Sequence, residues 1–130
     1  MNTEETEAIR RAADWLAERR ERESARLLRA AQDLAERLAR DQRVRKVILF
    51  GSIAQGEVGS GSDFDLAVVA DVDPAIPPPD RLGELYGHLG AARGIDLLVY
   101  TPEEFSAFGR TNRFVREEII AKGRVLYDRP

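Results

Sequence analysis

Residues 50–66 read FGSIAQGEVGSGSDFDL and hold the most informative pattern in the chain. They follow RVRKVILF (residues 43–50), whose apolar, β-branched end predicts a buried strand. Gly51 allows a sharp turn and a close approach to the backbone, because it lacks a Cβ atom. Ser52 would open a short helix whose free N–H groups, together with the serine hydroxyl, favour a bound anion.

Two aspartates open the next predicted strand, FDLAVVA at residues 64–70. The two-residue period of a strand places the carboxylates of Asp63 and Asp65 on one face. Carboxylates this close repel each other, which raises one pKa unless a cation lies between them. Asp96 is a lone acid within a third apolar strand, IDLLVY at residues 95–100. If the two strands are neighbours, three carboxylates converge, as a two-metal phosphoryl-transfer site requires.

A long helix is predicted at the amino-terminal end. Residues 4–41 contain neither Pro nor Gly and are rich in Ala, Leu, Glu and Arg, the strong helix formers. Their apolar positions form two stripes: Ile9, Ala13 and Leu16, then Leu27, Ala31, Leu34 and Leu38. The charged run ERRERES separates the stripes, and the sequence leaves open whether it breaks the helix. Trp15, beside the first stripe, is expected to pack.

The remaining elements complete the predicted fold. The proline-rich run at residues 71–80 predicts a loop. Thr101 and Pro102 are typical of a helix start. Further helices are expected near residues 81–92 and over 114–121, with a short strand at 125–127. The class is therefore α+β (α/β), a small mixed sheet flanked by helices, with residues 1–42 as a helical extension and 43–130 as one globular domain.

Composition limits the chemistry. The 130 residues include no cysteine and one histidine, which excludes disulfides, thiolate metal sites, cysteine nucleophiles and His-rich zinc sites. A bound metal would be a hard cation such as Mg²⁺, Mn²⁺ or Ca²⁺. The net charge of −3 argues against binding to long nucleic acid. No apolar run reaches the roughly 20 residues of a membrane helix, and no signal peptide is evident, so we expect a cytoplasmic protein.

The combined pattern resembles the minimal nucleotidyltransferases, a branch of the DNA polymerase β superfamily related to kanamycin nucleotidyltransferase. The pattern is a Gly-Ser pair after an apolar strand, ten intervening residues, an Asp-x-Asp pair, and a single Asp on a third strand. IDLLVYTPEEF and the ending REEIIAKGRVLYD are also similar to this family. The resemblance covers residues 44–128, and thus leaves the amino-terminal helix outside it.

The resemblance implies a site and a reaction. The implied catalytic and metal-binding residues, holding two Mg²⁺ ions or Mn²⁺, are Asp63, Asp65 and Asp96. The implied nucleotide-binding residues are Gly51, Ser52, Gln55, Gly56 and Ser62. The reaction would transfer a nucleotide monophosphate, AMP from ATP, to a hydroxyl and release pyrophosphate. Gln55 stands where the family usually has arginine, and glutamine can hydrogen-bond a phosphate but cannot neutralise it.

Three functions are compatible with this resemblance. The first is an antitoxin that adenylylates a HEPN-type protein partner. The second is a binding module that keeps the fold and sequesters a partner without turnover. The third is transfer to a small molecule such as an aminoglycoside. The two apolar stripes of the long helix, which a domain this small would not fully cover, also predict a contact with a partner or with a second copy of the chain.

Overall fold

The computed structural model describes residues 1–57, 63–90 and 94–130, except for the side chain of Glu84. The described strands form one four-stranded sheet in the order β3-β2-β1-β4. Their bounds are β1 Val44–Phe50, β2 Phe64–Ala70, β3 Ile95–Tyr100 and β4 Arg124–Asp128. β1 pairs antiparallel with β2 and β4, whereas β2 pairs parallel with β3. The predicted mixed sheet and α+β class are confirmed.

The helices differ from the prediction in detail. They are α1 Thr3–Leu38, α2 Gly51–Ala54, η1 Pro78–Arg81, α3 Leu82–Tyr86, η2 Gly87–Leu89, α4 Pro102–Thr111 and η3 Val115–Ala121. The proline run was expected to be loop throughout, but its last residues open the 3₁₀ helix η1, because proline fits a first helical turn that needs no N–H donor. The helix expected near residues 81–92 is divided into short pieces, and η3 is a π-helix.

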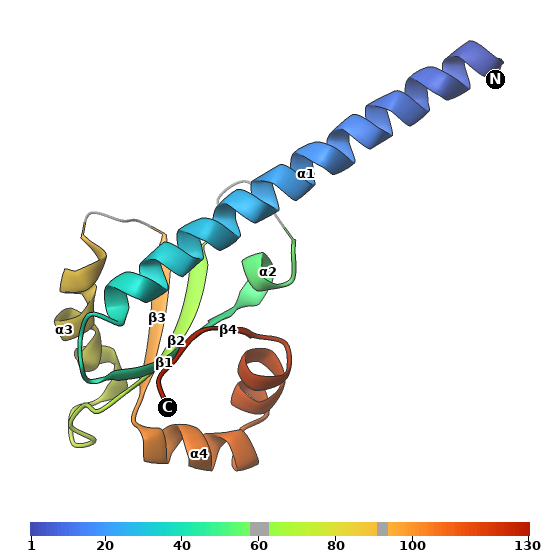
Figure 1. Ribbon diagram of the computed structural model, residues 1–130. Helices are drawn as coiled ribbons and strands as arrows, with labels where there is room; N and C mark the ends of the chain where they lie inside the picture. The colour runs from blue at the N-terminus through green and yellow to red at the C-terminus, as the bar shows by residue number, and fades with distance from the viewer. Residues whose placement is uncertain (58–62, 91–93) are drawn as a thin grey trace.

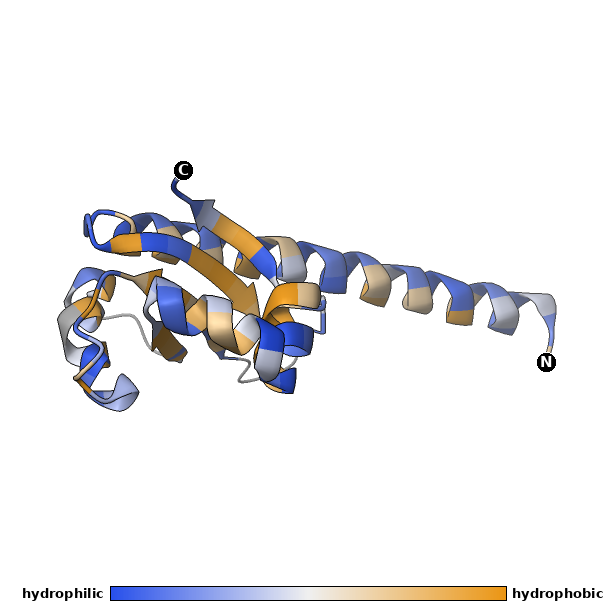
Figure 2. Ribbon diagram, turned by 90° about the horizontal axis from the view of Figure 1, so that it is seen from below, coloured by the Kyte–Doolittle hydropathy of each residue, from blue (hydrophilic) through white to orange (hydrophobic). Residues whose placement is uncertain are grey.

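Each face of the sheet has its own core (Figure 1). On one face α1, α3 and η2 pack against the strands through residues that include Ala31, Leu38, Leu85 and Leu89. On the other face Ile48, Phe50 and Ala67 of the sheet contact Val115 and Ile119 of η3, with Phe105 of α4 beside them. β1, β2 and β3 are mainly apolar, as their burial requires, whereas β4 at the sheet edge is exposed or half-buried (Figure 2).

α1 is one continuous helix that extends well beyond the sheet (Figure 1). It buries only Ala31, Leu34, Ala35 and Leu38, and every residue from 1 to 22 is exposed. The charged run therefore does not break it. The packing expected for Trp15 is wrong: 53% of this residue is exposed, with the Arg19 guanidinium 5.4 Å from its ring centroid. Among the described residues, no helix is both long enough and apolar enough to cross a membrane.

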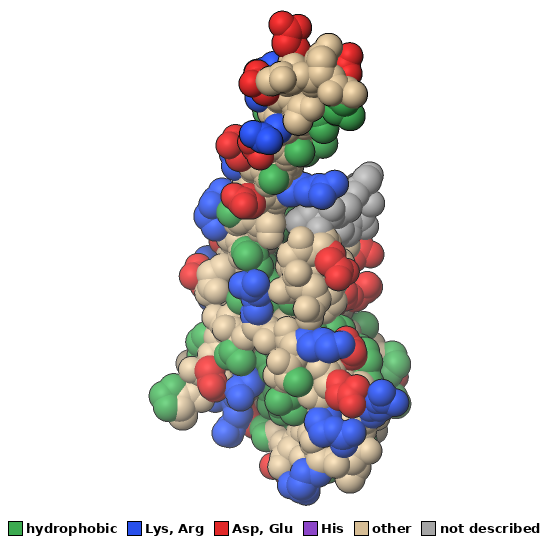
Figure 3. Space-filling view, turned by 90° about the vertical axis from the view of Figure 1, so that its right-hand side faces the viewer, with side chains coloured by type: hydrophobic (Ala, Val, Ile, Leu, Met, Phe, Trp, Pro, Cys, Tyr) green, Lys and Arg blue, Asp and Glu red, His purple; other side chains and the backbone are tan. Residues whose placement is uncertain are grey.

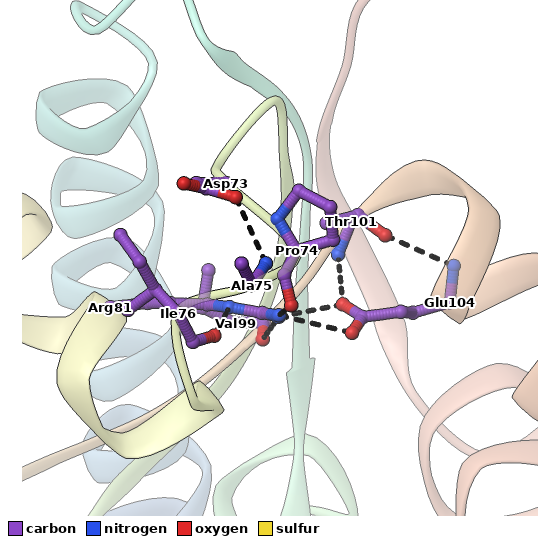
Figure 4. A network of polar contacts seen from close by, with 8 residues as sticks. All are labelled: Asp73, Pro74, Ala75, Ile76, Arg81, Val99, Thr101 and Glu104. Atoms are coloured by element: carbon purple, nitrogen blue, oxygen red, sulfur yellow. Dashed lines mark hydrogen bonds and ion pairs between the residues drawn. The ribbon is translucent and has the colours of Figure 1, made fainter.

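A buried ion pair joins the segment after β2 to β3 and α4 (Figure 4). Arg81 is only 1% exposed, and its Nη1 and Nη2 donate to the two carboxylate oxygens of Glu104 at 2.6 and 3.0 Å. The same guanidinium donates to the carbonyls of Ile76, Val99 and Pro74. Glu104 also completes a capping box with Thr101 at the start of α4. This network fixes the carboxyl end of β3.

Candidate active site

The three predicted aspartates lie where β1 ends and where β2 and β3 begin. Asp65 is paired with Phe50 of β1 on one side and with Asp96 of β3 on the other. Because β2 and β3 are parallel and in register, Asp65 and Asp96 are on the same face, the one that α4 and η3 cover further along. Asp63 immediately precedes β2. β3 therefore lies beside β2, which is the arrangement that convergence of the carboxylates requires.

The environment at this edge of the sheet disfavours the ionised form of Asp65. Burial is the main cause that raises its pKa, and the negative charges of Asp96 and Asp63 raise it further. The expected repulsion is therefore present, although desolvation exceeds it. Asp63 and Asp96 are exposed, whereas Asp65 is half-buried. A cation at this edge would lower the free energy of the ionised Asp65.

The donor set suits a hard divalent cation, because its ligands are carboxylate oxygens beside a group whose pKa is raised by like charges. Within residues 1–57, 63–90 and 94–130, however, no three Asp, Glu, His or Cys side chains are close enough to hold an ion as they stand. The carboxylates share one edge of the sheet, and metal binding would need them to draw closer together.

Two glycines make room for these carboxylates. Gly51 has φ 78°, and a Cβ atom on it would lie 2.2 Å from Oδ2 of Asp65. Gly94 has φ 70°, and a Cβ atom there would lie 2.9 Å from Oδ1 of Asp63. Its carbonyl also accepts a hydrogen bond from the N–H of Phe64 at 2.7 Å. Gly94 is missing from the sequence-based site, and its only signal was a glycine just before the strand of Asp96.

We expect Gly51→Ala to lower the free energy of unfolding more than Gly56→Ala does. Both glycines have positive φ, which costs alanine about 1–2 kcal/mol, but none of the described residues lies within 4 Å of a Cβ atom on Gly56. Displacement of the Asp65 carboxylate should add roughly 1–2 kcal/mol in the Gly51 variant alone. Urea unfolding measures both losses. Adding Asp65→Ala should remove the excess; equal losses in the two single variants would contradict this contact.

A cavity of about 330 Å³ lies between α2 and η3, next to Asp65. Its lining residues are Gly51, Ser52, Gln55, Glu57, Glu118 and Lys122. Three of the predicted nucleotide-binding residues therefore share one cavity. Gly56 instead lines a separate hollow against α1, and Ser62 lies outside the described residues. Sequence reasoning missed Glu118 and Lys122, because nothing local in the sequence links η3 to α2.

The charges around the cavity are mixed. One lysine and two glutamates belong to its described lining. The side of the molecule that carries α2 and η3 shows acidic and basic side chains interspersed, without a broad basic area on that face (Figure 3). This pattern fits a small, metal-accompanied anion better than a long nucleic-acid backbone.

The sequence model of the family described as "Polymerase beta, Nucleotidyltransferase" matches residues 32–130, and the chain belongs to this family. A protein of Methanocaldococcus jannaschii, named as a protein adenylyltransferase, is 34% identical over 87 residues. That alignment covers 65% of this chain and 80% of the archaeal protein.

Two solved structures are similar in fold. A crystal structure from Sulfolobus solfataricus, named as a nucleotidyltransferase, matches with a TM-score of 0.56 and 22% identity, covering 68% of this chain and 78% of that one. A toxin–antitoxin structure with AMP-PNP matches with a TM-score of 0.49 and 23% identity, covering 75% and 73%. At this identity the likeness to the Sulfolobus solfataricus structure concerns the fold alone.

Proposed function

We propose that this member of the nucleotidyltransferase family transfers AMP from ATP to a hydroxyl group of a partner protein and releases pyrophosphate. The main support is the placement of Asp65 and Asp96 in register on adjacent strands, beside a cavity that begins at Gly51. The name of the archaeal relative, of which this chain covers 80%, supports a protein as the acceptor.

Each residue has a role in this proposal. Ser52 and the backbone around Gly51 hold the outer phosphates of ATP, and Gln55 donates a hydrogen bond to them. Asp63, Asp65 and Asp96 would hold Mg²⁺, which would neutralise the triphosphate and orient it for in-line attack. A carboxylate oxygen of Asp96 accepts the proton of the acceptor hydroxyl. The deprotonated hydroxyl oxygen of the acceptor then bonds to the α-phosphorus, and the bond between this phosphorus and the oxygen of the leaving pyrophosphate breaks.

The acceptor must come from outside this chain. The cavity volume of about 330 Å³ lies at the small end of the roughly 300–1,000 Å³ usual for ligand pockets. A triphosphate fits such a space, and because the cavity is open to solvent the acceptor would approach it from the surface. We therefore propose a protein acceptor, a HEPN-type partner in a toxin–antitoxin pair, ahead of an aminoglycoside-like molecule or of a binding module without turnover.

A labelling assay tests this function. The protein is incubated with Mg²⁺, a HEPN-type protein as the candidate acceptor, and ATP labelled on either the α- or the γ-phosphate. Transfer of AMP labels the partner from the α-labelled ATP only. A stable complex with no label from either ATP would overturn the enzyme in favour of the binding module. Label on an aminoglycoside but not on the protein would favour the small-molecule reaction.

We further propose that the exposed part of α1 pairs antiparallel with the same part of a second copy. In this view residues 43–130 carry catalysis, and residues 1–42 form a helical extension. Ile9 and Leu16 lie on one helical face and are 57% and 46% exposed. Antiparallel alignment places Ile9 against Leu16 of the second copy and, by the same register, Glu5 against Arg20. Apolar and charged positions are therefore complementary in one arrangement.

Leu16→Glu should convert the dimer into a monomer, because it places a charge between the two paired helices. Trp15→Glu is the matched control: Trp15 is also exposed, at 53%, but lies on another face of α1. Sedimentation equilibrium measures the mass of each variant. A monomeric wild type, or a Leu16→Glu variant with unchanged mass, would refute the helix pairing. Deleting residues 2–22 should also give a monomer without affecting Mg²⁺ binding.

A further inference from the structure

The cavity between α2 and η3 is short of positive charge for the ligand proposed above. Lys122 is the one basic side chain in its described lining, and Glu57 and Glu118 are the two acidic ones. A nucleoside triphosphate would bring several more negative charges to this space, next to the aspartates at the end of the sheet. Its outer phosphates therefore need a cationic group from the protein in addition to any metal.

Backbone contacts place Lys122 at the rim of this cavity. Nε2 of Gln55 donates to the carbonyl of Lys122 at 3.4 Å, and Nε of Arg124 donates to the carbonyl of Ala54 at 2.9 Å. The first bond holds Lys122, directly after η3, against the end of α2, and the second holds the start of β4 there. The N–H of Lys122 donates to the carbonyl of Glu117 at 3.2 Å, a bond of the π-helix type. The main chain of Lys122 is therefore held, whereas its side chain is 54% exposed.

Among the residues that the structure describes, the ammonium group of Lys122 contacts only the carboxylate of Glu118, in an exposed ion pair. Its Nζ lies 3.1 Å from Oε1 of Glu118, which is itself 44% exposed. Pairs of this kind, four positions apart on a helix surface, are weak, because water solvates both partners. A phosphate oxygen carries more charge than a carboxylate oxygen and competes well for the same donor. The flexible four-carbon stem of lysine allows the exchange without movement of the helix.

We propose that Lys122 is the phosphate-binding cation of this site. Its ammonium group leaves Glu118 and donates to the β- or γ-phosphate of a nucleoside triphosphate held beside Gly51 and Ser52. Lys122 thus supplies, from η3, the charge that Gln55 on α2 does not have. This inference rests on the proposed function. Glu118 acts as a competitor that the incoming phosphate must displace.

The sequence makes a direct test practical, because it contains only two lysines, Lys46 and Lys122. Trace acetylation followed by mass spectrometry reports the reactivity of each lysine separately. Mg²⁺ and ATP should slow the acetylation of Lys122 by about tenfold, as one charged hydrogen bond would. Lys46 is the internal control: it belongs to β1, lies 3.7 Å from Asp128, and should react at an unchanged rate. AMP, which lacks the outer phosphates, should protect neither lysine.

Binding measurements on variants provide the second test. Lys122→Met should weaken ATP binding by about tenfold and leave AMP binding within about twofold, and Lys122→Arg should restore most of the loss. Glu118→Gln should act in the opposite direction and tighten ATP binding about threefold, because it removes both the competitor and a repelling charge. Lys46→Met should change neither affinity. Isothermal titration calorimetry measures all of these without requiring transfer.

The outcomes separate this inference from the function on which it rests. If the wild type binds ATP but Lys122 is not protected and Lys122→Met binds equally well, the assignment of Lys122 is wrong while the proposed transfer stands. If the wild type binds no ATP in the presence of Mg²⁺, the proposed function fails and the role of Lys122 fails with it. Equal loss of ATP and AMP binding in Lys122→Met would also overturn a contact with the outer phosphates.

Discussion

Replacing Asp63 and Asp65 together by asparagine should lower transfer of AMP by at least about a thousandfold, equivalent to about 4 kcal/mol of transition-state stabilisation. Asparagine keeps the shape of the side chain but removes the negative charges that would hold Mg²⁺. The measurement is incorporation of label from α-labelled ATP into the partner protein. Transfer within tenfold of the wild type would show that these carboxylates are not the catalytic ones.

The thermal stability of the Asp65→Asn variant shows whether a loss of transfer comes from lost catalysis or from unfolding. Burial and the nearby charges of Asp63 and Asp96 raise the pKa of Asp65, so ionisation of Asp65 opposes folding. Asp65→Asn should therefore unfold at an equal or higher temperature than the wild type at neutral pH. Asp71→Asn is the matched control, since Asp71 follows the other end of β2 and pairs with the exposed Arg45. It should leave transfer unchanged.

Arg81→Met should lower the free energy of unfolding by about 3–5 kcal/mol, the usual cost of leaving one partner of a buried ion pair alone. Arg81 is 1% exposed, and its loss removes the cation from Glu104, which keeps only the N–H of Thr101 among its described donors, and removes a donor from three backbone carbonyls. Chemical unfolding measures the change. Arg45→Met is the control, because the Arg45–Asp71 pair is about half exposed and contributes at most about 1 kcal/mol. Similar losses in the two variants would refute the buried-pair argument.

The same pair should give stability a characteristic dependence on pH. Hydrogen bonding from Arg81 lowers the pKa of Glu104 from 4.5 to about 2. A carboxyl group whose pKa is lower in the folded than in the unfolded protein stabilises the fold when it is ionised. This stabilisation is complete above the pKa of the unfolded protein and is lost as the pH falls toward the pKa of the folded protein. The stability difference between the wild type and Glu104→Gln should therefore be constant above about pH 5 and shrink between pH 4.5 and 2. A difference that grows in that range would contradict the assignment.

The sequence predicted the sheet, and the neighbouring positions of Asp65 and Asp96 on it, because both depend on local signals. The apolar runs ending at Phe50, Ala70 and Tyr100 are short, rich in branched residues and bounded by turn formers, so β1, β2 and β3 were placed within a residue. The period of two fixed the face of Asp65. Because Asp96 is an isolated acid inside an apolar strand, it was expected to have a partner group or a cation beside it. Its neighbour across the sheet is Asp65 of β2.

What the sequence did not reveal depends on contacts between distant positions. Arg81 and Glu104 are 23 positions apart, and neither is distinguishable from a surface charge before the fold is known. Lys122 comes next to α2 only because β4 pairs with β1 and carries the end of η3 with it. Trp15 was expected to pack because it lies beside an apolar stripe, but the sheet ends before α1 does. Periodicity identifies an apolar face and cannot show how far the covering surface extends.

The length of α1 sets the geometry of any assembly built on it. A rise of 1.5 Å per residue makes this 36-residue helix about 54 Å long, and its base is anchored in the sheet core. Two such helices paired antiparallel near their amino termini would hold the two globular domains at opposite ends of a stiff helical connection. The candidate active site of each subunit would then be accessible to an acceptor, because the other subunit would not cover it. One dimer with the proposed function would modify two partner molecules at the same time.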